Sequence, residues 1–152
     1  ADINVEYVPT VPYSSEGVEM KNLVCIEDGK LKNMHANCRY AYYLGMKPTG
    51  VYSKISVQPG DMSFDDMKAH KGLYVVNFSD FQMDSLSGFF GGEIRLAYYN
   101  DGEKIVPVTG GSVNGTIIDA QKDFEFSKET QENSTFAGPK AILLKDISVA
   151  GK

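Results

Sequence analysis

The clearest pattern in the chain is an alternation of apolar and polar residues around a turn. Residues 94–98 place Ile, Leu and Tyr at every second position, Asn100-Asp101-Gly102 follows, and apolar residues return at Ile105 and Val108. Strict alternation is typical of a half-buried β-strand, and a Gly-containing turn between two such runs predicts a hairpin. Glycine pairs at Gly91-Gly92 and Gly110-Gly111 bracket this hairpin and indicate bulges or close backbone approach.

Several other stretches have strand character. Asp28-Gly29 separates two apolar runs, and such a pair is a strong hairpin signal because both central residues of a type I′ turn need positive φ. Further strands are predicted over residues 51–57 and 72–78, and as two short strands on either side of Lys145-Asp146.

Helical spacing appears in three short segments. Residues 35–46 predict a helix that ends at Gly45, and Ser63-Phe64-Asp65-Asp66 is a capping box that opens a second helix before Gly72. Residues 116–124 predict the third. An extended arm is predicted for residues 1–17 and a polar surface loop for residues 123–138.

These elements predict one domain over residues 1–152. The expected fold is mainly β (α+β), with antiparallel β sheets or a barrel-like sandwich and about three short helices.

Charge and composition narrow the possible functions. The chain has 152 residues, 42% of them hydrophobic, and a net charge of −5, with only two arginines, Arg39 and Arg95. Nucleic-acid affinity depends on clustered Lys and Arg, so direct nucleic-acid binding is disfavoured. No apolar run approaches the roughly 20 residues of a membrane helix, and no signal peptide is visible at the start, although one removed earlier would leave no trace. Two isolated thiols, Cys25 and Cys38, fit a reducing cytoplasm.

Candidate metal ligands are few. His35 and Cys38 are three residues apart, and Cys25 lies one hairpin away, so a Cys₂His zinc site is one hypothesis. The favoured interpretation is structural, because burial rather than reactivity is usual for a free cysteine. His70 falls at the end of the capped helix, where a cation suits the helix dipole. The isolated chain is therefore predicted to bind no stoichiometric zinc.

Candidate nucleophiles and phosphate loops are equally incomplete. Gly110-Gly111-Ser112-Val113-Asn114 lacks the last glycine of the G-x-S-x-G elbow, and Ser112 has no assignable histidine partner. Neither of the common phosphate-binding glycine motifs is present. Aromatic clusters at Tyr40, Tyr42 and Tyr43 and at Phe89-Phe90 suit core or interface packing better than a peptide groove. No complete catalytic constellation is predicted.

Four segments together resemble a known family. They are SEGVEMKNLVCIEDGKLKNMHANCRYAYYLGMKPTG, ISVQPGDMSFDDMKAHKGLYVVNF, DSLSGFFGGEIRLAYYNDGEKIVPVTGGSVNGTIIDAQKD and GPKAILLKDISVAGK. In this order they resemble the C-terminal domain of the TldD/PmbA (TldD/TldE) metallopeptidases, also called modulators of DNA gyrase. The resemblance extends over nearly the whole chain, and its specificity comes from the order of the segments rather than from any one motif.

The resemblance implies that the zinc site and this region belong to different parts of a longer protein. Family members carry an H-E-x-x-x-H zinc motif upstream of this region, so the zinc belongs to the full-length protein or its partner subunit, and this chain alone is expected to be inactive. TldD-type members add a cysteine from the loop before the last strands; the equivalent loop here, FSKETQENSTFAG, has neither Cys nor His. This resembles the PmbA (TldE) branch. Phe89 stands where the family pattern has an Asp, which removes any role for that carboxylate.

Family members assemble as homodimers or heterodimers and degrade or trim unfolded peptides. By resemblance, the chain is expected to help shape the peptide cleft and the subunit interface. The residues proposed for this role lie in two glycine turns: Lys47, Pro48, Thr49, Gly50, Gly110, Gly111, Ser112 and Asn114. The alternative is a freestanding β-rich binding module without catalytic activity.

Overall fold

A computed structural model of the chain describes residues 3–151 and divides into two compact units. Unit 1 contains the residues up to Gly60 together with Glu129–Lys140, and unit 2 contains Asp61–Lys128 together with the residues from Ala141 onward. The prediction of one domain over residues 1–152 stays a prediction, because compactness alone does not show whether the units fold separately. Ala1 and Asp2 of the predicted arm lie outside the described residues.

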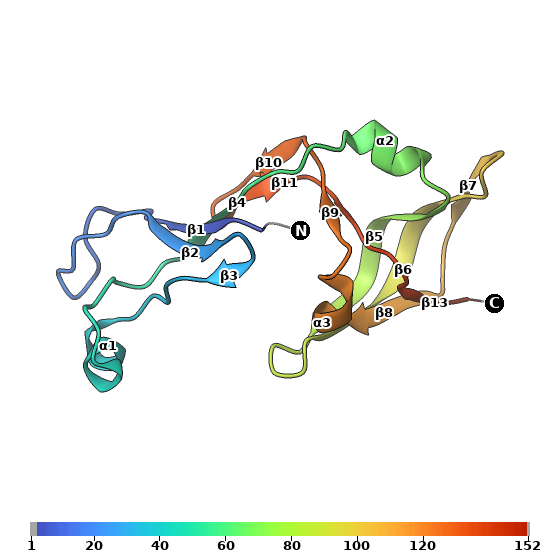
Figure 1. Cartoon of the computed structure of the whole chain (residues 1–152). Helices are drawn as coiled ribbons and strands as arrows, with labels where there is room; N and C mark the ends of the chain where they lie inside the picture. The colour runs from blue at the N-terminus through green and yellow to red at the C-terminus, as the bar shows by residue number, and fades with distance from the viewer. Residues whose placement is uncertain (1–2, 152) are drawn as a thin grey trace. The chain divides into compact units, whose positions relative to one another are not determined.

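Unit 1 is built on a six-stranded sheet with the order β10-β11-β4-β1-β2-β3 (Figure 1). Neighbouring strands are antiparallel except for the parallel pair β11 and β4. The elements of the unit are β1 (Val5–Val8), β2 (Leu23–Glu27), β3 (Lys30–Leu31), α1 (Cys38–Leu44), β4 (Lys54–Val57), β10 (Thr130–Glu132) and β11 (Phe136–Pro139). The predicted arm therefore supplies an interior strand, β1, between β2 and β4.

The hairpin predicted at Asp28-Gly29 is confirmed. Strands β2 and β3 pair on either side of it, and Asp28 and Gly29 have φ of 50° and 71°, as a type I′ turn requires. The strand predicted over residues 51–57 is also present, but it is shorter, because pairing with β1 covers only Lys54–Val57.

The surface loop predicted over residues 123–138 is wrong. That segment contains β10, β11 and, in unit 2, β9 (Glu125–Phe126). Phe136 pairs with Ile55 of β4, and all three residues of β10 are exposed. The polar, non-alternating sequence of this segment gave no strand signal. Strand β11 forms against β4, about eighty positions earlier in the chain, and β10 then pairs with β11 itself.

Unit 2 is built on an antiparallel sheet with the order β13-β8-β6-β5, in which β7 also pairs with β6, and on a small sheet of β9 and β12. Its remaining elements are α2 (Phe64–Ala69), β5 (Gly72–Met83), β6 (Phe89–Asn100), β7 (Ile105–Val108), β8 (Ser112–Thr116), α3 (Ile117–Ala120), β12 (Ile142–Leu143) and β13 (Ser148–Ala150). The hairpin predicted from the alternation at residues 94–108 is confirmed as β6 and β7. Strand β5 is longer than predicted, because it pairs with β6 along almost its whole length.

The core of unit 2 lies on one face of this sheet. Ile94, Ala97 and Val113 are buried, and partly buried residues of β5, β7 and the segment before β13 pack against them. Residues Ile94 and Ala97 come from β6, the central strand, so the best-covered positions are those with a paired strand on each side.

The predicted helix boundaries are largely confirmed. Asn37 and Ser63 cap α1 and α2 by accepting a hydrogen bond from the backbone N–H three residues on, and Gly45 ends α1 in the left-handed conformation. Helix α3 spans only Ile117–Ala120, shorter than the predicted 116–124, because Phe124 leads into β9 instead. The mainly β fold with antiparallel sheets and three short helices is thus present, and the sheets do not close into a barrel within residues 3–151. Nor does any helix in that range have the length and apolar character to span a bilayer.

Candidate functional site

The first predicted group, Lys47–Gly50, forms a turn that fastens the segment around α1. The backbone N–H groups of Thr49 and Gly50 both donate to the carbonyl of Ala36, at 3.0 and 3.1 Å. In return, the Thr49 hydroxyl accepts from the N–H of Ala36 at 2.9 Å. Because Ala36 is only 4% exposed, these bonds satisfy groups that water does not reach. Thr49 therefore has a structural role.

Gly50 has a packing reason as well as a backbone reason. Its φ is +81°, and a Cβ at this position would lie 2.0 Å from the sulfur of Met20. Lys47 and Pro48, in contrast, are exposed. Within this group, only Lys47 and Pro48 have exposed side chains.

The second predicted group, Gly110–Asn114, lies along one side of β6. Strands β7 and β8 pair with successive parts of β6, and the two glycines join them. This junction stays bonded to β6, because Gly110 N–H donates to Ile94 O and Ile94 N–H donates to Gly111 O, both at 2.9 Å. The glycines therefore keep the junction between β7 and β8 bonded to β6 rather than form an open loop for a phosphate.

Gly111 is also the point of closest approach to β13. A Cβ there would lie 2.4 Å from the carbonyl oxygen of Ala150, whereas a Cβ at Gly110 would have no atom within 4 Å. Both glycines have φ of +78°. Only Gly111 combines the left-handed backbone with a steric reason for lacking a side chain.

Ser112 and Asn114 are residues of β8. They pair with Glu93 and Gly91 of β6 on one side and with β13 on the other. A serine nucleophile of the G-x-S-x-G type sits at a turn between a strand and a helix, and Ser112 sits instead at the start of a paired strand. The sequence predicts Ser112 in a glycine turn, and the structure places it instead in strand β8, away from the setting of such a nucleophile.

An open hollow in unit 2 borders Asn114. Its lining includes Thr116, Asp119, Lys122 and Lys145. Lys122 Nζ and the Thr116 hydroxyl each donate to Asp119 at 2.9 Å, and these bonds lower the pKa of Asp119 below its usual range. Lys145 pairs with Glu125 at 3.2 Å. Both lysines are therefore paired with carboxylates, and the lining also includes two further acidic residues, Asp123 and Asp146.

The possible zinc ligands do not form a site. Cys25 is buried in β2, and Cys38 is exposed at the start of α1. His35 packs edge-on against Tyr7, with ring centroids 4.7 Å apart, and its buried Nδ1 has no hydrogen-bond partner among the described residues. Across residues 3–151, no three His, Cys, Asp or Glu side chains come together as a metal-binding group. The zinc that the family resemblance implies therefore does not fit this chain's own residues.

Sequence reasoning missed the cluster around His35. Tyr7, Tyr52 and His35 are in ring contact, and Tyr52 donates to the carbonyl of Lys21 at 2.6 Å. The hydrogen bond between Tyr7 and the Cys25 thiol, followed by burial, raises the pKa of Tyr7 to about 12. These residues come from β1, β2 and the two segments flanking α1, and no local pattern links them.

The fold defines the class of the domain: it is strand-dominated and has antiparallel sheets. In its two glycine turns, the predicted residues make backbone hydrogen bonds and close contacts rather than a group of reactive side chains. A model of the PmbA/TldA metallopeptidase C-terminal domain matches residues 4–151. The chain belongs to this family.

Known relatives agree with this assignment. The chain is 25% identical over 139 residues to a metalloprotease of Methanothermobacter thermautotrophicus, an alignment that covers 82% of this chain and 31% of the relative. The fold is similar to that of TldE from Thermococcus kodakarensis, with a TM-score of 0.84, 18% identity, and coverage of 98% of this chain and 40% of that one. A protein assigned as a modulator of DNA gyrase from Thermotoga maritima gives a TM-score of 0.82 at 18% identity, covering 99% and 39%. This chain therefore spans between 31% and 40% of the length of these proteins.

Proposed function

We propose that this chain is the C-terminal domain of a TldD/PmbA-type metallopeptidase or of its non-catalytic partner subunit, where it shapes the peptide cleft and contributes to the subunit interface. The observation that carries the proposal is the family match over residues 4–151. The substrate would be unfolded peptide. Catalysis would use zinc held outside this chain, since residues 3–151 gather no set of metal ligands.

A sheet edge supports the peptide part of the proposal. Strand β13 stands at one end of the unit 2 sheet and pairs with β8, which carries Ser112 and Asn114. An edge strand presents unpaired N–H and C=O groups, and an extended peptide can add to it through main-chain bonds that tolerate many sequences. Gly111 sets the position of this edge, because its missing side chain lets Ala150 approach. The glycine turn would thus act on the cleft through the position of β13.

The composition of residues 126–138 supports the non-catalytic branch. TldD-type members are expected to add a cysteine from this region, and residues 126–138 contain neither cysteine nor histidine. We therefore assign the chain to the PmbA (TldE) branch, whose partner subunit would supply the complete zinc site.

The proposal is tested in the full-length protein with its partner subunit. Replacing both Gly110 and Gly111 by valine should lower cleavage of an unfolded fluorogenic peptide by at least about tenfold, or prevent assembly, because the junction and β13 must both move. Gly151→Val is the matched control, since Gly151 has no atom within 4 Å of its Cβ position and should tolerate the change. Gly111→Ala, a milder change, checks the result if the double variant does not fold. Unchanged cleavage and assembly in both glycine variants would refute the proposal.

The coding sequence distinguishes the proposed function from the alternative, a freestanding binding module. A reading frame that encodes H-E-x-x-x-H, or a degenerate form of it, upstream of Ala1 supports the domain assignment. A start codon directly before Ala1 would favour the freestanding module.

A further inference from the structure

The outer edge of strand β13 is open. One side of β13 pairs with β8, and no other strand within residues 3–151 pairs with the opposite side. All three residues of β13 are exposed. An extended peptide that added to this edge would lie about 4.8 Å from β13, with its side chains alongside those of β13. The groups around β13 would therefore decide which peptide side chains fit.

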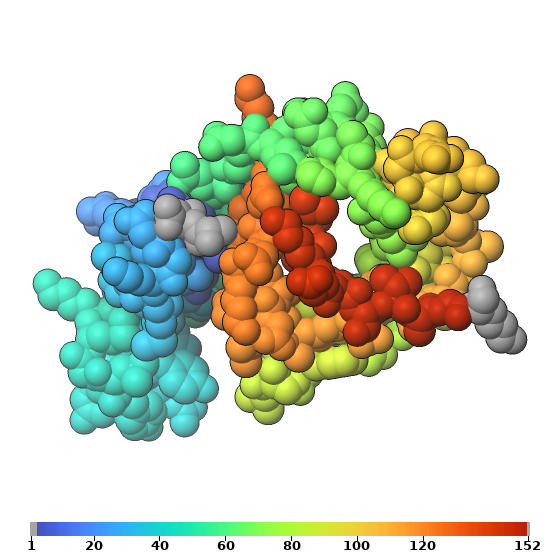
Figure 2. All heavy atoms as spheres, turned by 45° about the vertical axis from the view of Figure 1, so that its right-hand side comes forward, coloured from blue at the N-terminus to red at the C-terminus, as the bar shows by residue number. Residues whose placement is uncertain are grey.

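The open hollow of unit 2 begins at this strand. Ser148, the first residue of β13, and its β8 partner Asn114 both line the hollow. Figure 2 shows the surface hollowed between the red segment that leads into β13 and the orange segment that follows β8. Diagonal neighbours on adjacent strands are about 7–8 Å apart, a distance that long side chains span. A long side chain of an added peptide, placed opposite Ser148, therefore reaches the hollow, whereas a short one does not.

The hollow carries an excess of negative charge. Its charged lining residues are Asp119, Lys122, Asp123, Lys145 and Asp146. Lys122 pairs with Asp119 at 2.9 Å, and Lys145 pairs at 3.2 Å with Glu125, which is not a lining residue. Asp119 and, less strongly, Asp123 raise the pKa of Lys122, and Asp146 has no ion pair among the described residues. Asp123 and Asp146 thus remain beyond the carboxylates that pair with the two lysines.

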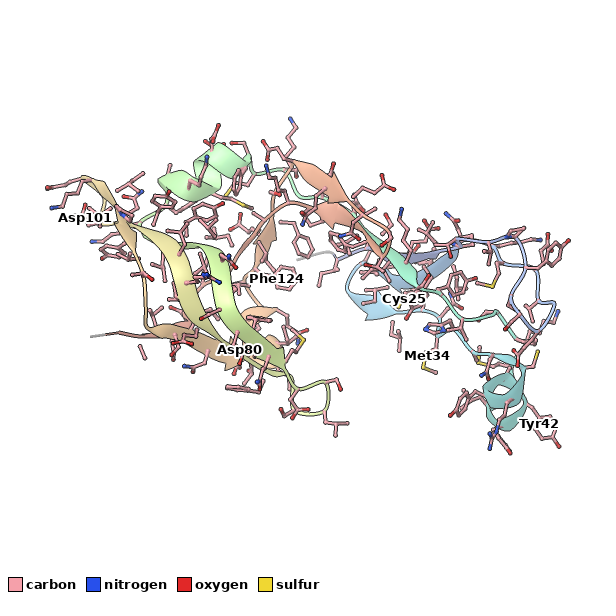
Figure 3. All side chains as sticks on the ribbon, turned by 180° about the vertical axis from the view of Figure 1, so that it is seen from behind. Cys25, Met34, Tyr42, Asp80, Asp101 and Phe124 are labelled. Carbon is pink, nitrogen blue, oxygen red and sulfur yellow. The ribbon has the colours of Figure 1, made fainter. Side chains whose placement is uncertain are left out.

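These two carboxylates stand on anchored segments. Asp123 precedes Phe124, which is 9% exposed and which Figure 3 shows in the interior of unit 2. Asp146 precedes Ile147, which packs against the buried core of the unit. Charges that are held in place before binding cost little to order on binding. The hollow is therefore suited to distinguishing peptide side chains by their charge.

We propose that this hollow is a side-chain subsite of the β13 edge and that it selects peptides with a lysine or arginine opposite Ser148. The peptide main chain would pair with β13, and the cationic group would lie beside Asp123 and Asp146. Within residues 3–151 these carboxylates do not gather as a metal-binding group, so the occupant is a cation that is anchored through its own main chain. The subsite narrows the substrate class of the proposed function, on which it rests, from any unfolded peptide to one with a cationic side chain.

The preference is expected to be modest and sensitive to salt. The carboxylates are exposed, and exposed ion pairs are weak, so lysine should be favoured over the uncharged norleucine by roughly three- to tenfold. Glutamate should be disfavoured by a similar factor, because it would face like charges. At about 1 M salt the Debye length is about 3 Å, and the preference should disappear.

Cleavage of three matched peptides by the full-length protein with its partner subunit tests the proposal. The peptides are unstructured and fluorogenic, and they differ at one position that holds lysine, norleucine or glutamate. This position is moved along the peptide one residue at a time, so that one placement falls opposite Ser148. At that placement kcat/KM should be highest for lysine and lowest for glutamate. Thermal unfolding confirms that each protein variant below is folded.

Two sets of substitutions locate the source of the preference. Asp123→Asn with Asp146→Asn should bring the lysine-to-norleucine ratio to about one, and asparagine suits the φ of +55° at Asp146. Asp61→Asn with Glu103→Gln is the matched control: it removes two exposed carboxylates of unit 2 that do not line the hollow, and it should leave the ratio unchanged. Asp123→Lys should reverse the order, so that the glutamate peptide is preferred.

The outcomes separate this subsite from the proposed function. If the peptides are cleaved without a charge preference at any placement, or if the preference survives in the double asparagine variant, the subsite is wrong and the proposed function stands. If the complex cleaves none of the peptides, both are overturned. A preference that is lost in the asparagine variant and kept in the control supports the subsite.

Discussion

The two units stabilise their sheets in different ways. In unit 2 the branched side chains of Ile94 and Val113 are buried at the centre of the sheet, and Phe90 and Phe124 are buried as well. In unit 1 the buried hydrophobic side chains are Met20, Cys25, Ala36 and Ala41, which are small apart from one flexible methionine. Unit 1 therefore has a shallow core and depends more on backbone pairing, the aromatic contacts of Tyr7 and the bonds made by Thr49.

This difference explains where the candidate functional features lie. Unit 1 leaves the tyrosines of α1 exposed, and its buried side chains are few and mostly small. Unit 2 fixes the position of an edge strand through a close backbone contact at Gly111. Unit 1 thus exposes an apolar helix surface, and unit 2 exposes the edge strand β13.

The largest effect is expected from the core of unit 2. Ile94→Ala should lower the free energy of unfolding by about 2–5 kcal/mol, because it removes buried methyl groups and leaves a cavity. Ile105→Ala is the matched control: Ile105 is 58% exposed, so its loss should change stability by less than about 1 kcal/mol. Chemical denaturation measures both. Hydrogen exchange shows whether β6 and β8 open more than β1 and β4; equal opening would contradict the contrast between the units.

The second prediction compares the loss of stability caused by alanine at the two adjacent glycines, Gly110 and Gly111. Gly110→Ala should cost about 1 kcal/mol, because alanine at positive φ is strained. Gly111→Ala should cost clearly more, since its Cβ would meet the carbonyl of Ala150 at 2.4 Å and displace β13. Thermal unfolding measures the difference, and hydrogen exchange at residues 148–150 locates it. Equal destabilisation by the two substitutions would show that the contact with β13 is unimportant.

The third prediction concerns the hydrogen bond between Thr49 and Ala36 in unit 1. Thr49→Val keeps the shape of the side chain but removes the acceptor for Ala36 N–H, which should cost about 1–3 kcal/mol. Thr49→Ser keeps the hydroxyl and should lose less. Hydrogen exchange should rise at Ala36 and in α1 for the valine variant. If valine and serine are equivalent, the hydroxyl does not fasten the turn.

The smallest expected effect is a loss of stability at high pH that comes from the ionisation of Tyr7. The folded state raises the pKa of Tyr7 from 10.0 to about 12. A raised pKa means that the folded state holds the proton more tightly, so the stability from this group is complete below pH 10 and is lost as the pH rises toward 12. In a titration of tyrosinate absorbance, a final step near pH 12 should belong to Tyr7, and Tyr7→Phe should remove it. An unchanged final step in the Tyr7→Phe protein would contradict this assignment.

Local sequence determined the turns and the ends of helices. Asp28-Gly29, Gly45 and Ser63 each occupy the predicted position, because the left-handed conformation and the helix cap depend on the residue itself and its immediate neighbours. The alternation at residues 94–98 also placed a strand correctly. For the proposed site residues, the sequence located two glycine turns but did not show that Thr49 hydrogen-bonds to Ala36 or that Gly50 lies against Met20.

Tertiary structure decided what depends on distant partners. Strand β11 forms because Phe136 reaches Ile55 of β4, and β10 forms beside it although its residues are polar and exposed. The requirement for glycine at position 111 comes from Ala150, and Ala41 is the buried residue of α1 whereas the tyrosines are exposed, which the local sequence did not show. A local pattern records the preferences of a segment, whereas pairing, close approach and burial are set by the residues that the folded chain brings against it.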